Sequence, residues 1–361
     1  MAALRRLPLA SLVPLLLVAL TAACGGNGVA LGQQEQVYLV SAGGGKVSRL
    51  TTGRGFSEAP AWSPDGRRIA FISGYRVVVT GRDGRSRRVV LRGETAFDPP
   101  SWSPDGRKLA FTALTRPEGP AGIVVAAADG ATFTPVAETG WGTADAQRGP
   151  VWSPDGRKLA FCLQGPETGL KGGVRASGEL NLVVSSADGG RRTTLTSAPG
   201  SELDPRWSPD GKWILYVATS PDEPGFSGAS LRVVPAAGGP SRTVVPLDES
   251  ASAAWSPSGR LIAFTGQVGA DSTTYLYVVR PDGSGLLRLT GEVVEQTPAW
   301  SPDGKSLAYT TYRGTIETIR PDGNGRKTIA SLGRADILDL AWSPNGKTIA
   351  FDARRTPPED E

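Results

Sequence analysis

The sequence predicts an all-β protein, a closed ring of seven four-stranded blades, which is a seven-bladed β-propeller. Three observations support this fold. The pentapeptide Trp-Ser-Pro-x-Gly occurs seven times, a second hairpin pattern also occurs seven times, and the chain begins and ends on complementary half-units. Repeats spaced by 40 to 55 residues bury their faces against one another. The periodicity therefore indicates one repeat per blade.

The pentapeptide is typical of a tight turn between two strands. Its copies begin at Trp62, Trp102, Trp152, Trp207, Trp255, Trp300 and Trp342. Proline presets φ, an Asp side chain accepts hydrogen bonds from nearby backbone N–H groups, and glycine adopts the left-handed conformation that closes a hairpin. Five copies carry Asp at the fourth position, whereas the other two carry Ser258 and Asn345. Because both replacements keep the turn chemistry without a carboxylate, we interpret the Asp as structural rather than catalytic or metal-binding.

A short apolar run follows each turn, as in Ile69-Ala70-Phe71. A nearly continuous apolar run is typical of a strand that is covered on both faces. The Trp ends the preceding strand, and we expect it to contribute a large buried surface to the blade. All seven tryptophans of the motif are therefore expected to have a structural role.

The second repeated element is an outer hairpin. It begins with Val37-Tyr38-Leu39-Val40, and its clearest later copy runs from Leu276 to Thr290 around an Asp-Gly turn. The chain opens with an outer hairpin (37–51) and closes with a Trp hairpin (341–353). Pairing these two half-units closes the ring over residues 37–353 and leaves few exposed strand edges. A solenoid would instead need a cap at each end.

The first residues have the pattern of an export signal. Arg5 and Arg6 precede an apolar stretch that reaches Leu20, and small residues lead to Cys24. The segment resembles a bacterial lipoprotein signal (residues 1–23) with Cys24 as the lipid attachment site, although Thr21 stands where a leucine is usual. An ordinary cleaved signal and an uncleaved anchor are the alternatives. Residues 24–36 are expected to form a flexible tether, and residues 354–361 a disordered tail.

The two repeated patterns together resemble the TolB-type, WD-repeat-like β-propeller. The resemblance rests on Trp-Ser-Pro-Asp-Gly-(Arg/Lys)-x-(Ile/Leu)-Ala-(Phe/Tyr), paired with Val-Val-x-Pro-Asp-Gly-x-Gly-x-x-x-Leu-Thr, and it covers residues 37–353. It implies a propeller fold, but similar repeats also occur in propellers of prolyl-oligopeptidase-type enzymes. TolB itself has an α/β domain before a propeller of six blades and is a soluble periplasmic protein. Only the propeller is therefore expected to carry over.

Composition excludes several kinds of chemistry. The chain has no histidine, which removes Ser–His–Asp and Cys–His catalysis and every His-ligated metal site. It has no Gly-x-Ser-x-Gly elbow and no cofactor motif, so we expect no cofactor and no metal. The net charge of +4 falls to +2 without Arg5 and Arg6, and no basic stripe suggests nucleic acid. With Cys24 modified, Cys162 would be a lone buried thiol. We expect a monomer.

Topology predicts where function lies. Short turns share one face of the ring, and the longer links 112–122, 163–179, 217–230 and 265–274 lie on the other, where binding residues are expected. Polar residues that precede the inner strands should surround the channel mouth on this second face, and two aromatic residues in the links could anchor a partner. The candidate partner-binding rim consists of Glu58, Asp98, Arg148, Asp204, Glu295, Asp336, Trp141 and Phe226. The structural alternative is that the acidic members bond to backbone N–H groups of neighbouring blades.

These observations favour an envelope-anchored, non-enzymatic propeller that binds a protein or polysaccharide partner through its long-loop face. The alternative is a carbohydrate-active hydrolase or lyase that uses carboxylates at the channel mouth. A signalling ectodomain would need a spanning segment after residue 24, which the sequence does not suggest.

Overall fold

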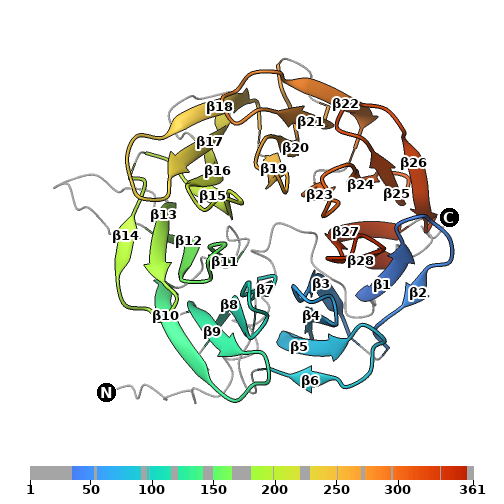
Figure 1. The fold of residues 1–361 in the computed structure, drawn as a ribbon, viewed down its shortest axis with the longest axis horizontal. Coiled ribbons are helices and arrows are strands. Elements are labelled where there is room, and N and C mark those ends of the chain that lie inside the picture. The colour runs from blue at the N-terminus through green and yellow to red at the C-terminus, as the bar shows by residue number, and fades with distance from the viewer. Residues whose placement is uncertain are drawn as a thin grey trace, which may run out of the picture.

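The computed structural model describes residues 35–52, 55–90, 96, 98–114, 121–140, 149–164, 180–197, 199–219, 228–249, 251–269, 273–293, 296–333 and 335–355. Within these ranges the chain is all-β and forms seven four-stranded antiparallel sheets around a central axis (Figure 1). The predicted seven-bladed propeller is confirmed. No helix in these ranges is long and apolar enough to cross a bilayer.

Six blades are continuous in sequence, and each runs from an inner to an outer strand. The first three are blade 1, with β3 (Ser57–Trp62), β4 (Arg68–Ser73), β5 (Arg76–Gly81) and β6 (Arg88–Val89); blade 2, with β7 (Ser101–Trp102), β8 (Lys108–Leu114), β9 (Ala121–Ala127) and β10 (Phe133–Gly140); and blade 3, with β11 (Val151–Trp152), β12 (Lys158–Gln164), β13 (Leu180–Ser186) and β14 (Arg192–Thr194). The next three are blade 4, with β15 (Glu202–Trp207), β16 (Trp213–Thr219), β17 (Ala229–Pro235) and β18 (Arg242–Leu247); blade 5, with β19 (Ala251–Trp255), β20 (Ile262–Gly266), β21 (Tyr275–Val279) and β22 (Leu287–Glu292); and blade 6, with β23 (Ala299–Trp300), β24 (Leu307–Thr311), β25 (Thr315–Ile319) and β26 (Lys327–Ser331).

The closing blade joins the two ends of the chain. Its strands, from the inside outward, are β27 (Ala335–Trp342), β28 (Thr348–Arg355), β1 (Glu35–Ser41) and β2 (Ser48–Arg49). Strand β1 pairs with β28 over its whole length, from Glu35 opposite Arg354 to Ser41 opposite Thr348. The expected closure of the ring by the two terminal hairpins is thus present.

The closing strands are longer than the expected hairpins 37–51 and 341–353. Glu35 and Gln36, assigned to the tether, belong to β1, and Arg354 and Arg355, assigned to the tail, belong to β28. The ladder continues because its polar side chains find partners: Gln36 Nε2 donates to Gly55 O at 2.8 Å. The signal (1–23), Cys24, the remainder of the tether and residues 356–361 lie outside the described residues.

The hydrophobic core lies between adjacent blades, where their flat faces meet. Between blades 1 and 2, for example, Val77 and Val79 pack with Leu109 and Phe111. The ninth residue after each motif Trp is a buried aromatic residue of the second strand. These residues are Phe71, Phe111, Phe161, Tyr216, Phe264, Tyr309 and Phe351. The continuous apolar runs of the sequence are thus covered from both sides, as the pattern predicts.

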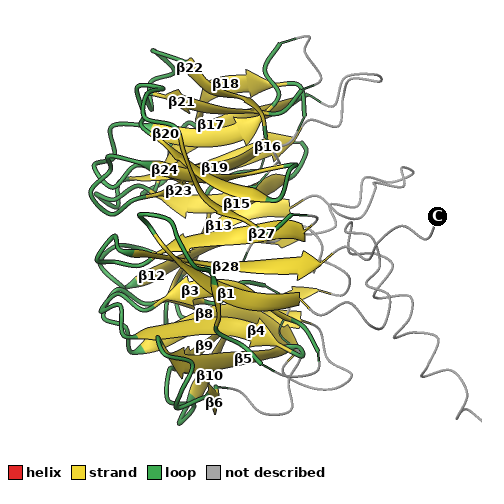
Figure 2. Ribbon diagram, turned by 90° about the vertical axis from the view of Figure 1, so that its right-hand side faces the viewer, coloured by secondary structure: helices red, strands yellow, loops and turns green. Residues whose placement is uncertain are grey.

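The short turns all lie on one face, which we call the turn face. It faces the viewer in Figure 1 and lies on the left of Figure 2. The opposite face, the loop face, receives the connections between blades and the links from second to third strands. The inner strands and β1 begin on the loop face, and β28 ends there. Candidate rim residues were predicted on this loop face.

Candidate functional site

Each Trp-Ser-Pro-x-Gly motif forms the same hydrogen-bonded turn. In blade 1 the Ser63 hydroxyl donates to Asp65 Oδ1 at 2.6 Å, and Arg67 N donates to the same oxygen at 3.0 Å. These bonds lower the pKa of Asp65, with the Ser63 hydroxyl as the main cause of the decrease. Asn345 takes the same place in the closing blade, accepting from Ser343 Oγ at 2.8 Å. The fourth residue of the motif therefore organises the turn.

The tryptophans link the blades in a continuous ring of hydrogen bonds. Each indole Nε1 donates, at 3.0 to 3.2 Å, to the backbone oxygen that precedes the Trp of the previous blade. The pairs are Trp62 to Ala341, Trp102 to Ala61, Trp152 to Ser101, Trp207 to Val151, Trp255 to Arg206, Trp300 to Ala254 and Trp342 to Ala299. The motif thus carries a contact between blades that its sequence does not reveal.

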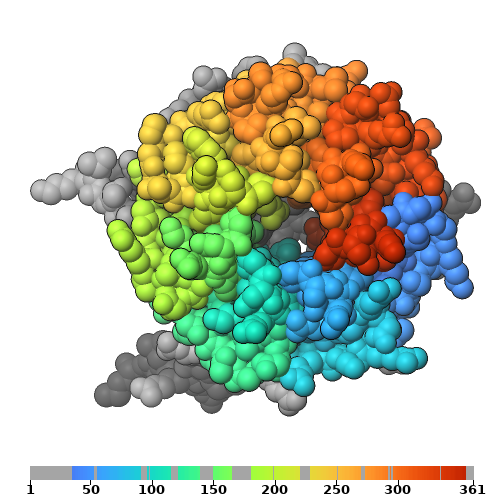
Figure 3. All heavy atoms as spheres, in the orientation of Figure 1, coloured from blue at the N-terminus to red at the C-terminus, as the bar shows by residue number. Residues whose placement is uncertain are grey.

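The centre of the turn face is hollowed (Figure 3). A cavity of about 380 Å³ lies there, lined mainly by the motif tryptophans and prolines of blades 2 to 4, with Arg206 and Trp255 beside them. The lining is mostly apolar because the indole N–H groups point to neighbouring backbone oxygens. This opening is on the face where the sequence suggested the least function.

On the loop face, the four described acidic rim residues differ in their surroundings. Asp98 and Asp204 are only 3% and 6% exposed, so they lie between blades and do not line an open mouth. Asp204 forms an ion pair with Arg206, with Oδ1 at 2.7 Å from Nη2. Burial raises the pKa of Asp98 to about 7. Hydrogen bonds from the Thr112 hydroxyl and the Gly149 amide lower this pKa, but they only partly offset the effect of burial. The contact with Gly149 of blade 3 matches the structural alternative.

Asp336 is the one half-exposed acidic residue of these four. Its Oδ2 accepts a hydrogen bond from Arg354 Nη2 at 3.0 Å. Glu58 of β3 is partly buried, and it lies where blade 1 packs against the closing blade. The other rim candidates, Arg148, Glu295, Trp141 and Phe226, lie outside the described residues, so the predicted rim stays a prediction for them.

Glu58 belongs to a group of carboxyl groups at the ring closure. Burial raises its pKa to about 8, and the negative charges of Glu35 and Asp339 contribute. Glu35 and Asp352 are 4% and 0% exposed, and their carboxyl groups lie close enough to influence each other's protonation. Burial and a neighbouring carboxyl group both disfavour the charged form of a carboxyl group. Burial accordingly raises the pKa of Glu35, and that of Asp352 well above its usual range.

The backbone also contributes to this carboxyl group cluster, which comprises Glu35, Glu58, Asp339 and Asp352. Strand β27 is irregular between Ile337 and Leu340, and there the Asp339 N–H donates to Asp352 Oδ1 at 2.9 Å. Among the described side chains, no group of three or more Asp, Glu, Cys or His residues has the arrangement of a metal site.

Sequence reasoning identified Glu58 but missed Glu35 and Asp352. Glu35 was placed in the tether, before the first recognisable strand pattern. A usable signal was present at Asp352, because it follows the aromatic residue of the second strand in the closing blade. Its counterparts in the other blades are Ile72, Thr112, Cys162, Val217, Thr265 and Thr310. A carboxylate among these mainly apolar and hydroxyl side chains marks the position as unusual.

The ring of sheets, the repeated turns and the composite closing blade define a seven-bladed β-propeller built from WD-like repeats. The model of the TolB beta propeller domain matches residues 72–345, so the chain belongs to the TolB β-propeller domain family. The resemblance expected from the motifs is thereby confirmed.

Curated relatives match over a limited part of their length. The Tol-Pal system protein TolB of Anaeromyxobacter dehalogenans (strain 2CP-C) is 32% identical over 126 residues, which are 33% of this chain and 26% of that protein. The chain thus spans about a quarter of the length of the curated relatives it matches.

Solved structures share the fold at low identity. TolB from Acinetobacter baumannii aligns with a TM-score of 0.51 and 17% identity, over 91% of this chain and 72% of that one. An oligogalacturonate lyase from Vibrio parahaemolyticus aligns with a TM-score of 0.58 and 13% identity, over 90% and 84%. A TolB and an oligogalacturonate lyase thus share this architecture, and the fold alone does not select a function.

Proposed function

We propose that this chain is an envelope-anchored, non-enzymatic propeller that binds a protein or polysaccharide partner through its loop face. Membership of the TolB domain family supports a binding role, and the curated relatives are named for the Tol-Pal system. The observation that carries the proposal is the half-exposed ion pair of Asp336 and Arg354, which lies on the loop face where the ring closes. Of the two kinds of partner, a protein that presents charged residues complementary to this ion pair fits best.

The half-exposed ion pair of Asp336 and Arg354 offers a direct test of this surface. In envelopes of the native cell, Asp336→Ala should reduce partner capture by chemical cross-linking and co-purification. Shortening the connection between β8 and β9, or that between β12 and β13, should reduce it further. The matched control is Asp129→Ala, which removes an exposed carboxylate from a hairpin of the turn face. If the partner is retained by all three loop-face variants, the loop face is not the binding surface.

Polysaccharide binding is distinguished from protein binding in the same preparation. Digestion of the cross-linked product with protease should remove the partner if it is a protein, whereas glycan-degrading enzymes should leave it unchanged. The reverse pattern would assign a polysaccharide partner. A cross-linked partner that neither treatment removes would contradict both assignments.

The anchor is tested separately. A lipid on Cys24 would contribute about 0.8 kcal/mol per buried CH₂ group to membrane binding. Replacement of Cys24 by alanine should therefore move the protein from the membrane fraction to the soluble fraction. Retention in the membrane fraction after alkaline washing would contradict lipid attachment at this residue.

A carbohydrate-active hydrolase or lyase is the second candidate. The favouring observation is Glu58, whose pKa of about 8 would keep a proton available near neutral pH. Against it, Glu35 and Asp352 are almost fully buried and so cannot flank a polysaccharide. Purified protein incubated with uronate polymers should release no reducing ends or unsaturated products. Turnover that Glu58→Gln abolishes would support the enzyme and contradict the non-enzymatic proposal.

A further inference from the structure

A second cavity, of about 300 Å³, lies between blades 3 and 4, away from the central axis. Blade 3 contributes the residues after β14, including Leu195, Thr196 and Pro199. Blade 4 contributes side chains of β15 to β17 that point toward blade 3, among them Glu202 and Tyr216. A volume of this size is at the lower end of the range for small-molecule sites.

Arg232 of β17 provides the positive charge of this cavity. It stands opposite Tyr216 in the sheet, and its Nη2 donates to Ser241 Oγ at 2.9 Å. Its Nε is buried, and no atom of the described residues accepts a hydrogen bond from it. A buried donor of a charged group is unfavourable without an acceptor, so this edge of the guanidinium is suited to an incoming oxygen atom.

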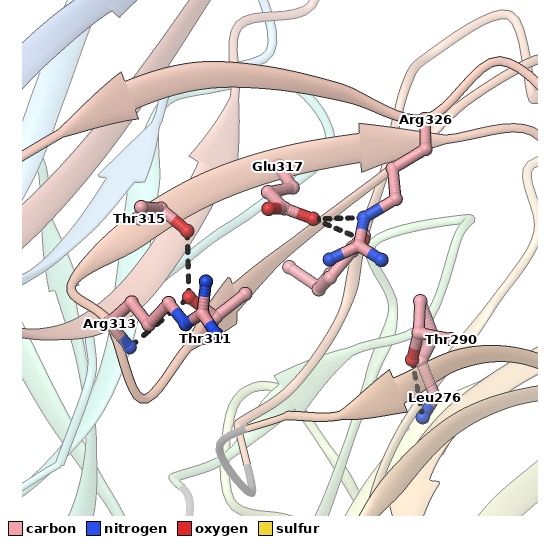
Figure 4. A network of polar contacts seen from close by, with 8 residues as sticks. Leu276, Thr290, Thr311, Arg313, Thr315, Glu317 and Arg326 are labelled. Atoms are coloured by element: carbon pink, nitrogen blue, oxygen red, sulfur yellow. Dashed lines mark hydrogen bonds and ion pairs between the residues drawn. The ribbon is translucent and has the colours of Figure 1, made fainter.

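Blade 6 shows how the same positions look when they are internally satisfied. Glu317 takes the place of Arg232, opposite Tyr309, and Arg326 takes the place of Ser241. Glu317 Oε2 accepts from both the Tyr309 hydroxyl and Arg326 Nε, each at 2.6 Å, and Figure 4 shows the pair with Arg326. Blade 6 thus supplies its own carboxylate to its own cation.

In the other five blades this third-strand position is apolar or aromatic. The residues opposite the buried aromatic side chain are Val78, Val124, Val183, Tyr277 and Tyr38. Blade 4 alone places a cation there. The two positions that hold Glu317 and Arg326 in blade 6 thus hold a cation, Arg232, and a neutral hydroxyl, Ser241, in blade 4.

The rest of the lining narrows the ligand. Arg232 is the only cationic side chain among the described lining residues, and Glu202 adds a negative charge that disfavours a multiply charged anion such as phosphate. Hydroxyl groups of Thr196, Ser197 and Ser230 line the cavity as donors and acceptors. Ala218 provides an apolar wall for the carbon skeleton.

We infer that this cavity binds a small hydroxylated monocarboxylate, such as a sugar acid, with its carboxylate on Arg232. The hydroxyl groups of the ligand hydrogen-bond to Glu202 and to the Ser and Thr side chains of the cavity. The inference is independent of the proposed partner surface, because the cavity lies between blades 3 and 4 and uses no residue of the ring closure.

The test is isothermal titration calorimetry, in which D-glucuronate is added to the full-length protein in detergent micelles. D-glucose, which has the hydroxyl groups without the carboxylate, and inorganic phosphate are the comparison ligands. We expect glucuronate to bind at least about tenfold more tightly than either, because a charge-assisted contact to Arg is lost with glucose. Equal binding of glucose, tighter binding of phosphate, or no heat with glucuronate up to about 10 mM overturns the inference.

The variants assign the site. Arg232→Gln should weaken glucuronate binding at least about tenfold. The matched control is Arg326→Gln in blade 6, because the Arg326 guanidinium already pairs with Glu317. This variant should bind glucuronate like the parent protein. If Arg232→Gln does not fold, Arg232→Lys keeps the charge but loses the planar donor edge and should still weaken binding. Unchanged affinity in the folded Arg232 variant, or equal loss in the Arg326 variant, contradicts the site.

Discussion

Glu58 makes the stability of the ring depend on pH in an unusual direction. Its pKa of about 8 in the folded protein compares with 4.5 for an ordinary glutamate. The folded state therefore binds the proton more tightly than the unfolded chain. The contribution of protonated Glu58 to the free energy of unfolding is fully present below pH 4.5. It is lost progressively as the pH rises toward 8. Replacement by glutamine, which resembles the protonated side chain, should remove this loss.

The magnitude follows from the two pKa values. At 1.36 kcal/mol for each pKa unit, holding Glu58 in the folded state reduces the free energy of unfolding by about 1 kcal/mol at pH 5 and about 3 kcal/mol at pH 7. Glu58→Gln should therefore stabilise the protein by these amounts, with a gain that grows by about 2 kcal/mol between the two pH values.

The assay is urea unfolding followed by tryptophan fluorescence at pH 5 and pH 7. The control is Glu249→Gln, the same change at an exposed position, which should alter stability by less than about 0.5 kcal/mol at both pH values. If the gain from Glu58→Gln is the same at pH 5 and pH 7, Glu58 does not titrate as the carboxyl cluster requires, and the account of that cluster is refuted.

Three further predictions concern the blades. Trp152→Phe, which leaves Ser101 O without its indole donor, should cost about 1 kcal/mol in urea unfolding, whereas Trp152→Ala should cost about 3–5 kcal/mol because a cavity is added. Asp65→Asn should change the free energy of unfolding by less than about 0.5 kcal/mol, since Asn345 makes the same bonds in the closing blade. Asp65→Ala should cost about 1 kcal/mol. Equal costs for the two variants would show that the turn does not use the Oδ1 acceptor. Glu317→Ala should cost about 1–3 kcal/mol because it leaves the Tyr309 hydroxyl without its acceptor. Adding Tyr309→Phe to this variant should recover part of the lost stability. A double-mutant cycle would measure the coupling between the two residues.

The fold could be predicted because its signals repeat. Seven copies of a turn motif give the blade number, and the complementary terminal hairpins give the closure. Strand boundaries at the closure were less predictable. Glu35 and Arg354 show no β pattern of their own, and they become strand residues only because β1 and β28 pair along their whole length.

The candidate site was harder to predict because it does not repeat. Glu35 and Asp352 are distant in sequence, and their contact depends on closure of the ring. Asp98 and Asp204 precede inner strands as expected, but the packing of neighbouring blades buries them. Periodicity places a residue near the axis, and only the packing decides whether it faces solvent or another blade.

The indole ring also bears on how such a chain can change its length. Every blade gives one hydrogen bond to the blade before it and receives one from the blade after it, and the bond from Trp62 to Ala341 treats the junction of the two chain ends like any other. A gene that gained or lost a whole repeat would therefore keep every indole bonded. The pattern of indole bonds alone therefore does not set the number of blades, and rings of different size could be built from one repeat.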